Sequence, residues 1–190
     1  MINTEIIKES ISSFISLNEM EWQQLFGFIE VKILKKNAYF LKKGQICESI
    51  AFLNSGSMIY YKLLETGKEV TIDFVFKGDW VTEYQSRLNH TPSLLYIKAI
   101  EESELVIITN KNLDELYDKV PKLERLGRIL TEKAFLKVVQ QSIDLQTMSA
   151  SERYTKLLNE HPEIFQRIPQ YHIANYLGIA PKSLSRIRKR

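Results

Sequence analysis

The chain has 190 residues, enough for one large core or two small ones, and its 44% hydrophobic and 26% charged residues are typical of a soluble globular protein. Charges interrupt every apolar stretch, and the amphipathic opening "MINTEIIKESISSFI" ends in no small-residue cleavage site, so we expect neither a membrane span nor a signal peptide. The single cysteine, Cys47, excludes an intrachain disulfide, a CxxC redox pair and an iron–sulfur cluster, which favours a cytoplasmic protein.

The formal net charge of +3 is unevenly distributed along the chain. Residues 151–190 contain eight basic and three acidic residues, a net of +5, whereas the rest contains 18 basic and 20 acidic residues, a net of −2. This distribution predicts a polyanionic partner for the C-terminal region, although a solvated charged end would explain the charge equally well.

Two amphipathic helices are predicted within the first thirty residues. Their apolar side chains recur at helical spacing, at Ile6, Ile7, Ile11, Phe14 and Ile15 in the first helix and at Trp22, Leu25, Phe26 and Ile29 in the second. Asn18 and Glu21 have the spacing of a capping box, so we expect the second helix to begin after Asn18.

From Val31 to about Ile108 the apolar period changes to two, which predicts strands. The strand-like runs include "SIAFL", "GSMIYYKLL", "EVTIDFVF", "LLYIKAI" and "ELVIIT", and "ETGK" at residues 65–68 is expected to form a hairpin turn. No alternation of strands and helices is present, so the pattern indicates an antiparallel barrel or sandwich rather than a Rossmann or TIM fold.

Helical spacing returns between Asn112 and Met148, with a wide apolar surface after Pro121. The apolar residues are Leu123, Leu126, Leu130, Ala134 and Val138 on one stripe and Ile129, Leu136, Val139 and Ile143 beside it. A helix this long and apolar has to be covered on two sides. Little chain remains to cover it, which favours dimerisation over a long core helix of a monomer.

The last forty residues have the pattern of a helix-turn-helix. "SASE" at residues 149–152 is a capping box, Pro169 and Gly178 bound one short helix, and Pro181 begins the last one. Small and apolar residues at Ala174, Leu177, Leu184 and Ile187 would pack these two helices together, and Gly178 permits the left-handed backbone of the turn. Lys182, Ser183, Ser185, Arg186 and Lys189 then face outward, where cations and hydroxyls suit guanine edges and phosphates. A helical hairpin with a solvated basic face is the alternative interpretation.

The stretch "IPQYHIANYLGIAPKSLSRIRKR" resembles the helix-turn-helix of the Crp/Fnr family of bacterial transcription regulators, and "MSASERYTKLLNEHPEIFQRIPQYHIANYLGIAPKSLSRIRK" is especially similar to a branch common in Bacteroidetes. The resemblance extends over nearly the whole chain and implies an α+β fold. A cyclic-nucleotide-binding-like β-roll with flanking helices is expected over residues 1–110, a dimerisation helix over 111–148 and a helix-turn-helix domain over 149–190.

The same resemblance implies function. A homodimer, formed through the helix at residues 121–145, would place each recognition helix on one half-site of a near-palindromic operator in double-stranded DNA. On the family's pattern Pro181, Lys182 and Arg186 would meet base edges, and Ser183 and Ser185 would lie beside phosphate. Lys189 is expected to strengthen binding to all sequences alike.

Two departures from the family's pattern matter for DNA binding. Lys182 stands where the family usually has Glu, and Lys donates to guanine whereas Glu accepts from cytosine, so we expect a different operator preference. The sequence ends at Arg190, before the β-hairpin wing that often follows, so a helix-turn-helix without a full wing is expected. Arg188, Lys189 and Arg190 are candidates for a compensating phosphate clamp.

The family's effector site is only partly present. "KGDWVTEYQSRLNHTPSLLYIKAI" keeps the turn at Gly78 and the acidic Glu83, which would bond a ribose hydroxyl, but the arginine that would neutralise a cyclic phosphate falls on Ser93. Burying a phosphate without that cation would be strongly unfavourable, so a response to cyclic AMP is not expected. Arg87 is a nearby candidate for another anion, and a small-molecule effector of unknown identity is left open.

The sequence therefore predicts a homodimeric, sequence-specific DNA-binding transcription regulator that is not an enzyme and has no cofactor or metal site. RNA polymerase is left open as a further partner, and a membrane is not expected to be one. The alternative is a ligand-sensing β-roll that binds a protein partner through its helical tail.

Overall fold

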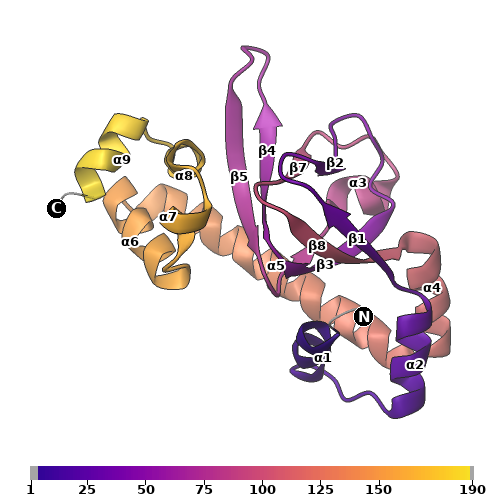
Figure 1. Ribbon diagram of the computed structural model, residues 1–190. Coiled ribbons are helices and arrows are strands. Elements are labelled where there is room, and N and C mark those ends of the chain that lie inside the picture. Colours follow the sequence, from indigo (N-terminus) through magenta and orange to yellow (C-terminus); the bar gives the residue numbers. More distant parts are fainter. Residues whose placement is uncertain (1–3, 189–190) are drawn as a thin grey trace.

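A computed structural model describes residues 4–188 of the chain (Figure 1). Its helices are α1 (Glu5–Ser12), α2 (Glu19–Gly27), α3 (Tyr84–Asn89), α4 (Asn110–Lys119), α5 (Pro121–Thr147), α6 (Ala150–Glu160), α7 (Ile164–Arg167), α8 (Gln170–Tyr176) and α9 (Pro181–Arg188). None of the helices in this part of the chain is both long enough and apolar enough to cross a membrane. The capping box at Asn18 and Glu21 is confirmed, with each residue's side chain bonded to the other's backbone N–H.

Eight strands form the β-roll: β1 (Glu30–Leu34), β2 (Tyr39–Leu41), β3 (Ser49–Ser55), β4 (Ser57–Leu63), β5 (Glu69–Phe76), β6 (Trp80–Val81), β7 (Tyr96–Ala99) and β8 (Ser103–Thr109). They make two antiparallel sheets, the first in the order β1-β8-β3-β6 and the second in the order β2-β7-β4-β5. The predicted hairpin turn joins β4 to β5, with Gly67 at a positive φ of 78°. This hairpin rises beyond the rest of the roll (Figure 1).

Alternation along the strands sends side chains to two different cores. Met58, Val75 and Ile97 are buried inside the roll together with Leu53 and Leu105. The intervening residues of the second sheet point to its outer face, where Ile59, Tyr61 and Phe74 pack against the C-terminal helices. The second sheet is therefore buried on both faces.

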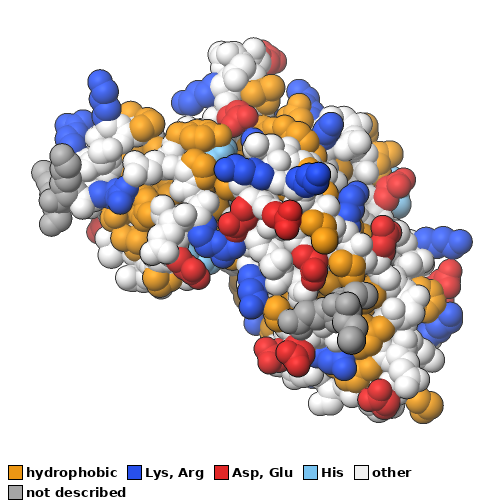
Figure 2. Space-filling model, in the orientation of Figure 1, with side chains coloured by type: hydrophobic (Ala, Val, Ile, Leu, Met, Phe, Trp, Pro, Cys, Tyr) orange, Lys and Arg blue, Asp and Glu red, His pale blue; other side chains and the backbone are white. Residues whose placement is uncertain are grey.

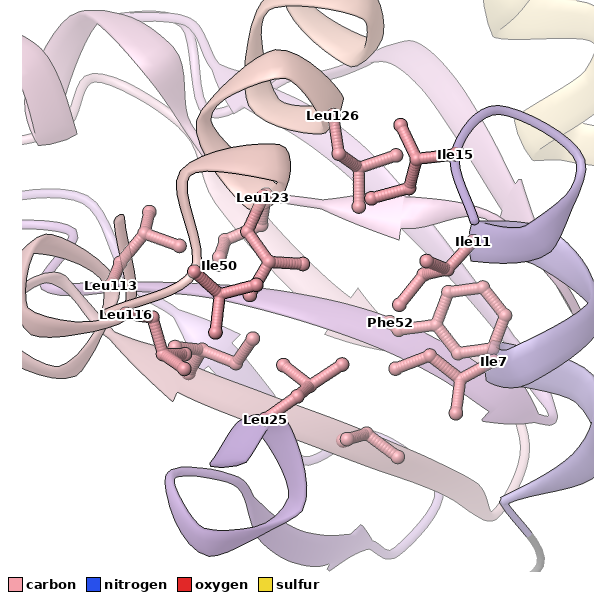
Figure 3. Packing of buried hydrophobic residues seen from close by; sticks show 13 residues of the cluster. Ile7, Ile11, Ile15, Leu25, Ile50, Phe52, Leu113, Leu116, Leu123 and Leu126 are labelled. Atoms are coloured by element: carbon pink, nitrogen blue, oxygen red, sulfur yellow. The ribbon is translucent and has the colours of Figure 1, made fainter. Parts of the chain in front are cut away.

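The N-terminal helices cover the first sheet and join it to α4 and α5. Their contact is an apolar cluster in which side chains from α1, α2, α4 and α5 meet those of β3 (Figure 3). The labelled members are Ile7, Ile11, Ile15, Leu25, Ile50, Phe52, Leu113, Leu116, Leu123 and Leu126. This cluster holds the first half of α5 against the roll.

The segment predicted as one dimerisation helix over 111–148 consists of two helices. α4 begins at Asn110, inside the range assigned to the roll, and ends before Val120, whose φ of −134° and ψ of 79° are not helical. Pro121 then occupies the first turn of α5, where its missing N–H costs nothing. The break arises because a residue that precedes proline is disfavoured in the helical conformation.

Residues 149–188 contain only helices and connecting turns. The capping box of Ser149 and Glu152 begins α6 as predicted, and α9 begins at Pro181 as predicted. The short helices α3 and α7 were not predicted, because four to six residues are too few to show a helical period.

Candidate DNA-binding interface

The connection between α8 and α9 is a tight turn centred on Gly178. Gly178 has a φ of 70°, a conformation that favours glycine because it has no Cβ. The N–H of Gly178 donates to the carbonyl of Asn175 at 3.0 Å, and the N–H of Ile179 donates to the carbonyl of Ala174 at 3.0 Å. These bonds close the end of α8 and send the chain into α9.

A small apolar core holds α8 and α9 at a defined angle. Ala174, Leu177 and Leu184 are fully buried, and Ile187 is half-buried. The guanidinium of Arg153 on α6 donates to the carbonyl of Leu177 at 2.8 Å and to that of Met148 at 2.7 Å. Arg153 thus ties the turn of the helix-turn-helix to the end of α5.

The outward surface of α9 carries the predicted DNA-contacting side chains. Pro181, Lys182, Ser185 and Arg186 are exposed, and Ser183 is half-buried. Neither Lys182 nor Arg186 forms an ion pair with any carboxylate within residues 4–188. Figure 2 shows Lys and Arg side chains, in blue, at the α9 end of the molecule. Two cations without local counter-charges therefore lie on one helix face.

Two other side chains that were predicted to contact DNA make contacts within the protein. The hydroxyl of Ser185 donates to the carbonyl of Pro181 at 3.2 Å, so that side chain is turned back on its own helix. The guanidinium of Arg188, a candidate for the phosphate clamp, lies 4.5 Å from the ring centre of Phe165 and packs against the protein. Lys189 and Arg190 lie outside the described residues.

The second half of α5 leaves the roll with apolar side chains uncovered. Ile129 is half-buried, and Leu136, Val139 and Ile143 on the same side of the helix are exposed, Leu136 by 63%. On an adjoining side, Phe135, Val138 and Leu145 are exposed as well. The end of the helix is fixed to α6 by an ion pair of 2.5 Å between Asp144 and Lys156, which also lowers the pKa of Asp144.

The predicted effector residues are occupied by local bonds. Both carboxylate oxygens of Glu83 accept from the N-terminus of α3, from the N–H groups of Gln85 and Ser86 at 3.0 Å each. The Ser93 side chain is buried and bonded to the backbone of Leu95, with its hydroxyl accepting from the N–H at 3.0 Å and donating to the carbonyl at 3.2 Å. A carboxylate therefore takes the amide groups that an anionic ligand would need.

Gly78 and Arg87, the other two predicted effector residues, also make local contacts. Gly78 has a φ of 95° in the turn before β6, and its N–H donates to the carbonyl of Leu53 at 2.8 Å. The guanidinium of Arg87 lies 5.7 Å from the ring centre of Tyr84, on its own helix. Within residues 4–188, no three His, Cys, Asp or Glu side chains gather as metal ligands.

Sequence reasoning did not find the residues that connect this interface to the roll. α8 lies against β5, and Thr71 on β5 shares a hydrogen bond of 3.1 Å with Nδ1 of the buried His172. The available signal was His172 itself, a polar side chain beside Ile173 and Ala174 on the buried side of α8. Its partner lies 101 residues earlier in the chain, beyond the reach of any local pattern.

The structure thus combines a roll of two antiparallel sheets with a long helix and a helix-turn-helix. Residues 31–120 match the cyclic nucleotide-binding domain family. An anaerobic regulatory protein of Haemophilus influenzae is 28% identical over 187 residues, which cover 90% of this chain and 71% of that protein.

Solved structures extend the likeness. FixK2 from Bradyrhizobium japonicum has a TM-score of 0.74 at 17% identity, covering 85% of this chain and 83% of that one. A transcriptional regulator of the Crp/Fnr family from Eubacterium rectale has a TM-score of 0.68 at 20% identity, covering 91% and 82%. Residues 31–120 are thus similar to cyclic nucleotide-binding domains, and the chain as a whole is similar to bacterial regulatory proteins.

Proposed function

We propose that this protein is a sequence-specific DNA-binding transcription regulator. The observation that carries the proposal is the outward surface of α9, where Lys182 and Arg186 are exposed and lack ion pairs within residues 4–188 while Leu184 anchors the opposite side of the helix. Long cations on a helix of this kind suit guanine edges and phosphates in a major groove. Double-stranded DNA is therefore the proposed partner.

The proposed active form is a homodimer joined through α5. The exposed stripe of Leu136, Val139 and Ile143 supports it, because a helix in water does not keep such a surface uncovered without a partner. Two copies related by a two-fold axis would present two α9 helices to a near-palindromic operator with half-sites about one helical turn apart. An activator of this kind would also contact RNA polymerase.

The proposed regulator does not respond to cyclic AMP. Glu83 caps α3 with both of its carboxylate oxygens, and Ser93 offers no positive charge. A cyclic phosphate buried there would meet the Glu83 carboxylate and would find no cation at Ser93, which is unfavourable. Calorimetry with cyclic AMP and cyclic GMP is expected to detect no binding, and micromolar affinity for either would contradict this part of the proposal.

Selection from a pool of random duplexes tests the DNA-binding proposal and identifies the operator. The full chain is expected to enrich a near-palindromic motif and to bind it with an affinity that falls steeply with salt. If the chain retains all sequences equally, or retains none, the alternative hypothesis is favoured, in which the helical tail binds a protein partner.

Arg186→Ala measures the contribution of the recognition helix. We expect it to cost roughly 1–3 kcal/mol of binding free energy and to relax preference at one base pair of each half-site. Lys43→Ala is the control, because Lys43 is an exposed cation between β2 and β3, outside both α5 and α9. Equal losses in the two variants, measured by fluorescence anisotropy, would contradict the assignment of α9.

A further inference from the structure

The C-terminal helical unit (α6–α9) is packed on the outer face of the second sheet of its own chain. Ile173 and Leu177 on α8 are buried in one cluster with Ile59, Tyr61 and Phe74 of β4 and β5. The rings of Phe74 and Tyr176 lie 4.9 Å apart, and those of Phe76 and His161 lie 4.4 Å apart. Figure 1 shows α8 beside the hairpin of β4 and β5.

A buried polar pair lies at the centre of this contact. Thr71 Oγ1 and His172 Nδ1 share a hydrogen bond of 3.1 Å, and the two residues are 3% and 1% exposed. Beside them, the side-chain amide of Asn175 donates to the carbonyl of Glu69 at 3.1 Å. Apolar packing tolerates sliding and rotation, whereas a buried hydrogen bond is satisfied only at one position, so this pair fixes where α8 lies on β5.

Further polar contacts surround the pair and reach α5. Arg167 on α7 pairs with Glu101 and donates to the carbonyl of Gly56, at the beginning of the same hairpin. Lys137 on α5 pairs with Asp73 on β5 at 2.6 Å, and Gln141 on α5 donates to the hydroxyl of Tyr176 at 3.3 Å. β5 is thus bonded both to α8 and to the helix proposed to form the dimer.

We propose that Thr71 and His172 are positioning residues, which fix the recognition helix α9 relative to α5 by holding α8 on β5. This inference rests on the proposed function as a dimeric DNA-binding regulator. In such a dimer the spacing of the two half-sites is set by the placement of each α9 relative to the axis between the α5 helices. With α8 held on β5, that placement depends on the roll and not only on the joint between α5 and α6. The proposed consequence is a narrow tolerance for half-site spacing.

Thr71→Val removes the hydrogen bond while keeping the shape of the side chain. The measurement is the affinity of the full chain for its selected operator and for versions in which the half-sites are one base pair closer or farther apart. We expect the preference for the natural spacing to fall by roughly threefold to tenfold, the effect of losing one buried hydrogen bond. Thr71→Ser keeps the hydroxyl and is expected to keep the wild-type preference for the natural spacing. Thr66→Val, in the exposed turn of the same hairpin, is the matched control.

Amide hydrogen exchange of the free protein separates positioning from general loss of stability. In Thr71→Val, faster exchange is expected in α8 and β5, with no change in the cluster of α1, α2, α4 and α5. An unchanged spacing preference in Thr71→Val would overturn the inference, whatever the exchange. Faster exchange throughout the chain would overturn it as well, since it would show a structural role only.

The operator selection and the spacing measurement together distinguish the two proposals. If the wild-type chain selects no DNA sequence, the proposed function fails, and the role in positioning α9 on DNA fails with it. If it selects an operator but Thr71→Val, Thr71→Ser and Thr66→Val share one spacing profile, only the positioning role is wrong.

Discussion

Lys182 illustrates how a single side chain on α9 can change what the same backbone reads. It is exposed on the second residue of the helix and forms no ion pair within the described part of the chain. An ammonium group donates hydrogen bonds and accepts none, so it matches guanine O6 and N7, whereas a carboxylate at that place matches the amino group of cytosine. The type of residue at position 182 therefore determines the preferred base. Gly178 and Leu184 determine the position of α9 and hence that this side chain faces outward.

Lys182→Glu is expected to exchange the preferred base at one position of each half-site from guanine to cytosine. The variant loses a cation that also attracts phosphates, so its affinity for its own best site should be lower and less dependent on salt. Selection from the same pool of random duplexes measures the change. Retention of the wild-type motif by the variant would show that Lys182 contacts only phosphate.

At the scale of elements, α5 has two different halves. In its first half, Leu123 and Leu126 are buried in the cluster with α1, α2 and α4. Most of its second half is exposed. Leu136, Val139 and Ile143 are spaced by three and four residues, the spacing of a helix–helix contact. The same stripe on a second copy is the simplest cover for this surface.

Leu136→Glu combined with Ile143→Glu is expected to convert the proposed dimer into a monomer at micromolar concentration. Each substitution would place a carboxylate in an apolar interface, at a cost of several kcal/mol. Sedimentation measures the mass, and Leu88→Glu is the control expected to stay dimeric, because Leu88 is as exposed as Leu136 but lies on α3. A double variant with the wild-type mass would place the interface elsewhere.

At the scale of the whole molecule, the roll and the C-terminal helical unit share one apolar core and one buried histidine. Burial and, to a smaller extent, the nearby positive charge of Lys98 on β7 together lower the pKa of His172 to about 4. Tyr171, next to His172 on α8, and Glu69 on β5, which acts electrostatically on Tyr171, also lie at this contact. The contact therefore favours neutral histidine.

Acid is expected to separate the two parts of the molecule. Because the pKa of His172 lies below its value of about 6.5 in the unfolded chain, its share of the docking free energy is complete above pH 6.5 and is lost as the pH falls toward 4. The loss amounts to about 3 kcal/mol at most. Exchange protection of α8 should fall over this range in the wild-type chain and not in His172→Gln. Equal pH profiles for the two proteins would show that His172 does not control the contact.

Local features of the fold were predictable because their causes lie within a few residues of one another. The capping boxes at Asn18 and Ser149, the left-handed Gly178 and the first turn of α9 at Pro181 are all confirmed. The break at Val120 could also have been derived from the following proline, but the apolar period on both sides of it suggested one continuous helix. The short helices α3 and α7 were not predicted because they contain too few residues to show a helical period of apolar side chains.

By itself, the sequence determined the succession of a helical, a strand-rich and a second helical region, the helix-turn-helix and the side chains that α9 exposes, since helix caps, turn glycines and apolar spacing act over one or two turns of chain. Only the tertiary structure decided that Glu83 caps α3, that Arg153 ties the turn to α5 and that His172 meets Thr71. A polar side chain takes whichever partner the fold brings within about 3 Å, and that choice depends on how distant segments pack. The placement of the recognition helix is therefore a property of the packed molecule rather than of the segment that contains it.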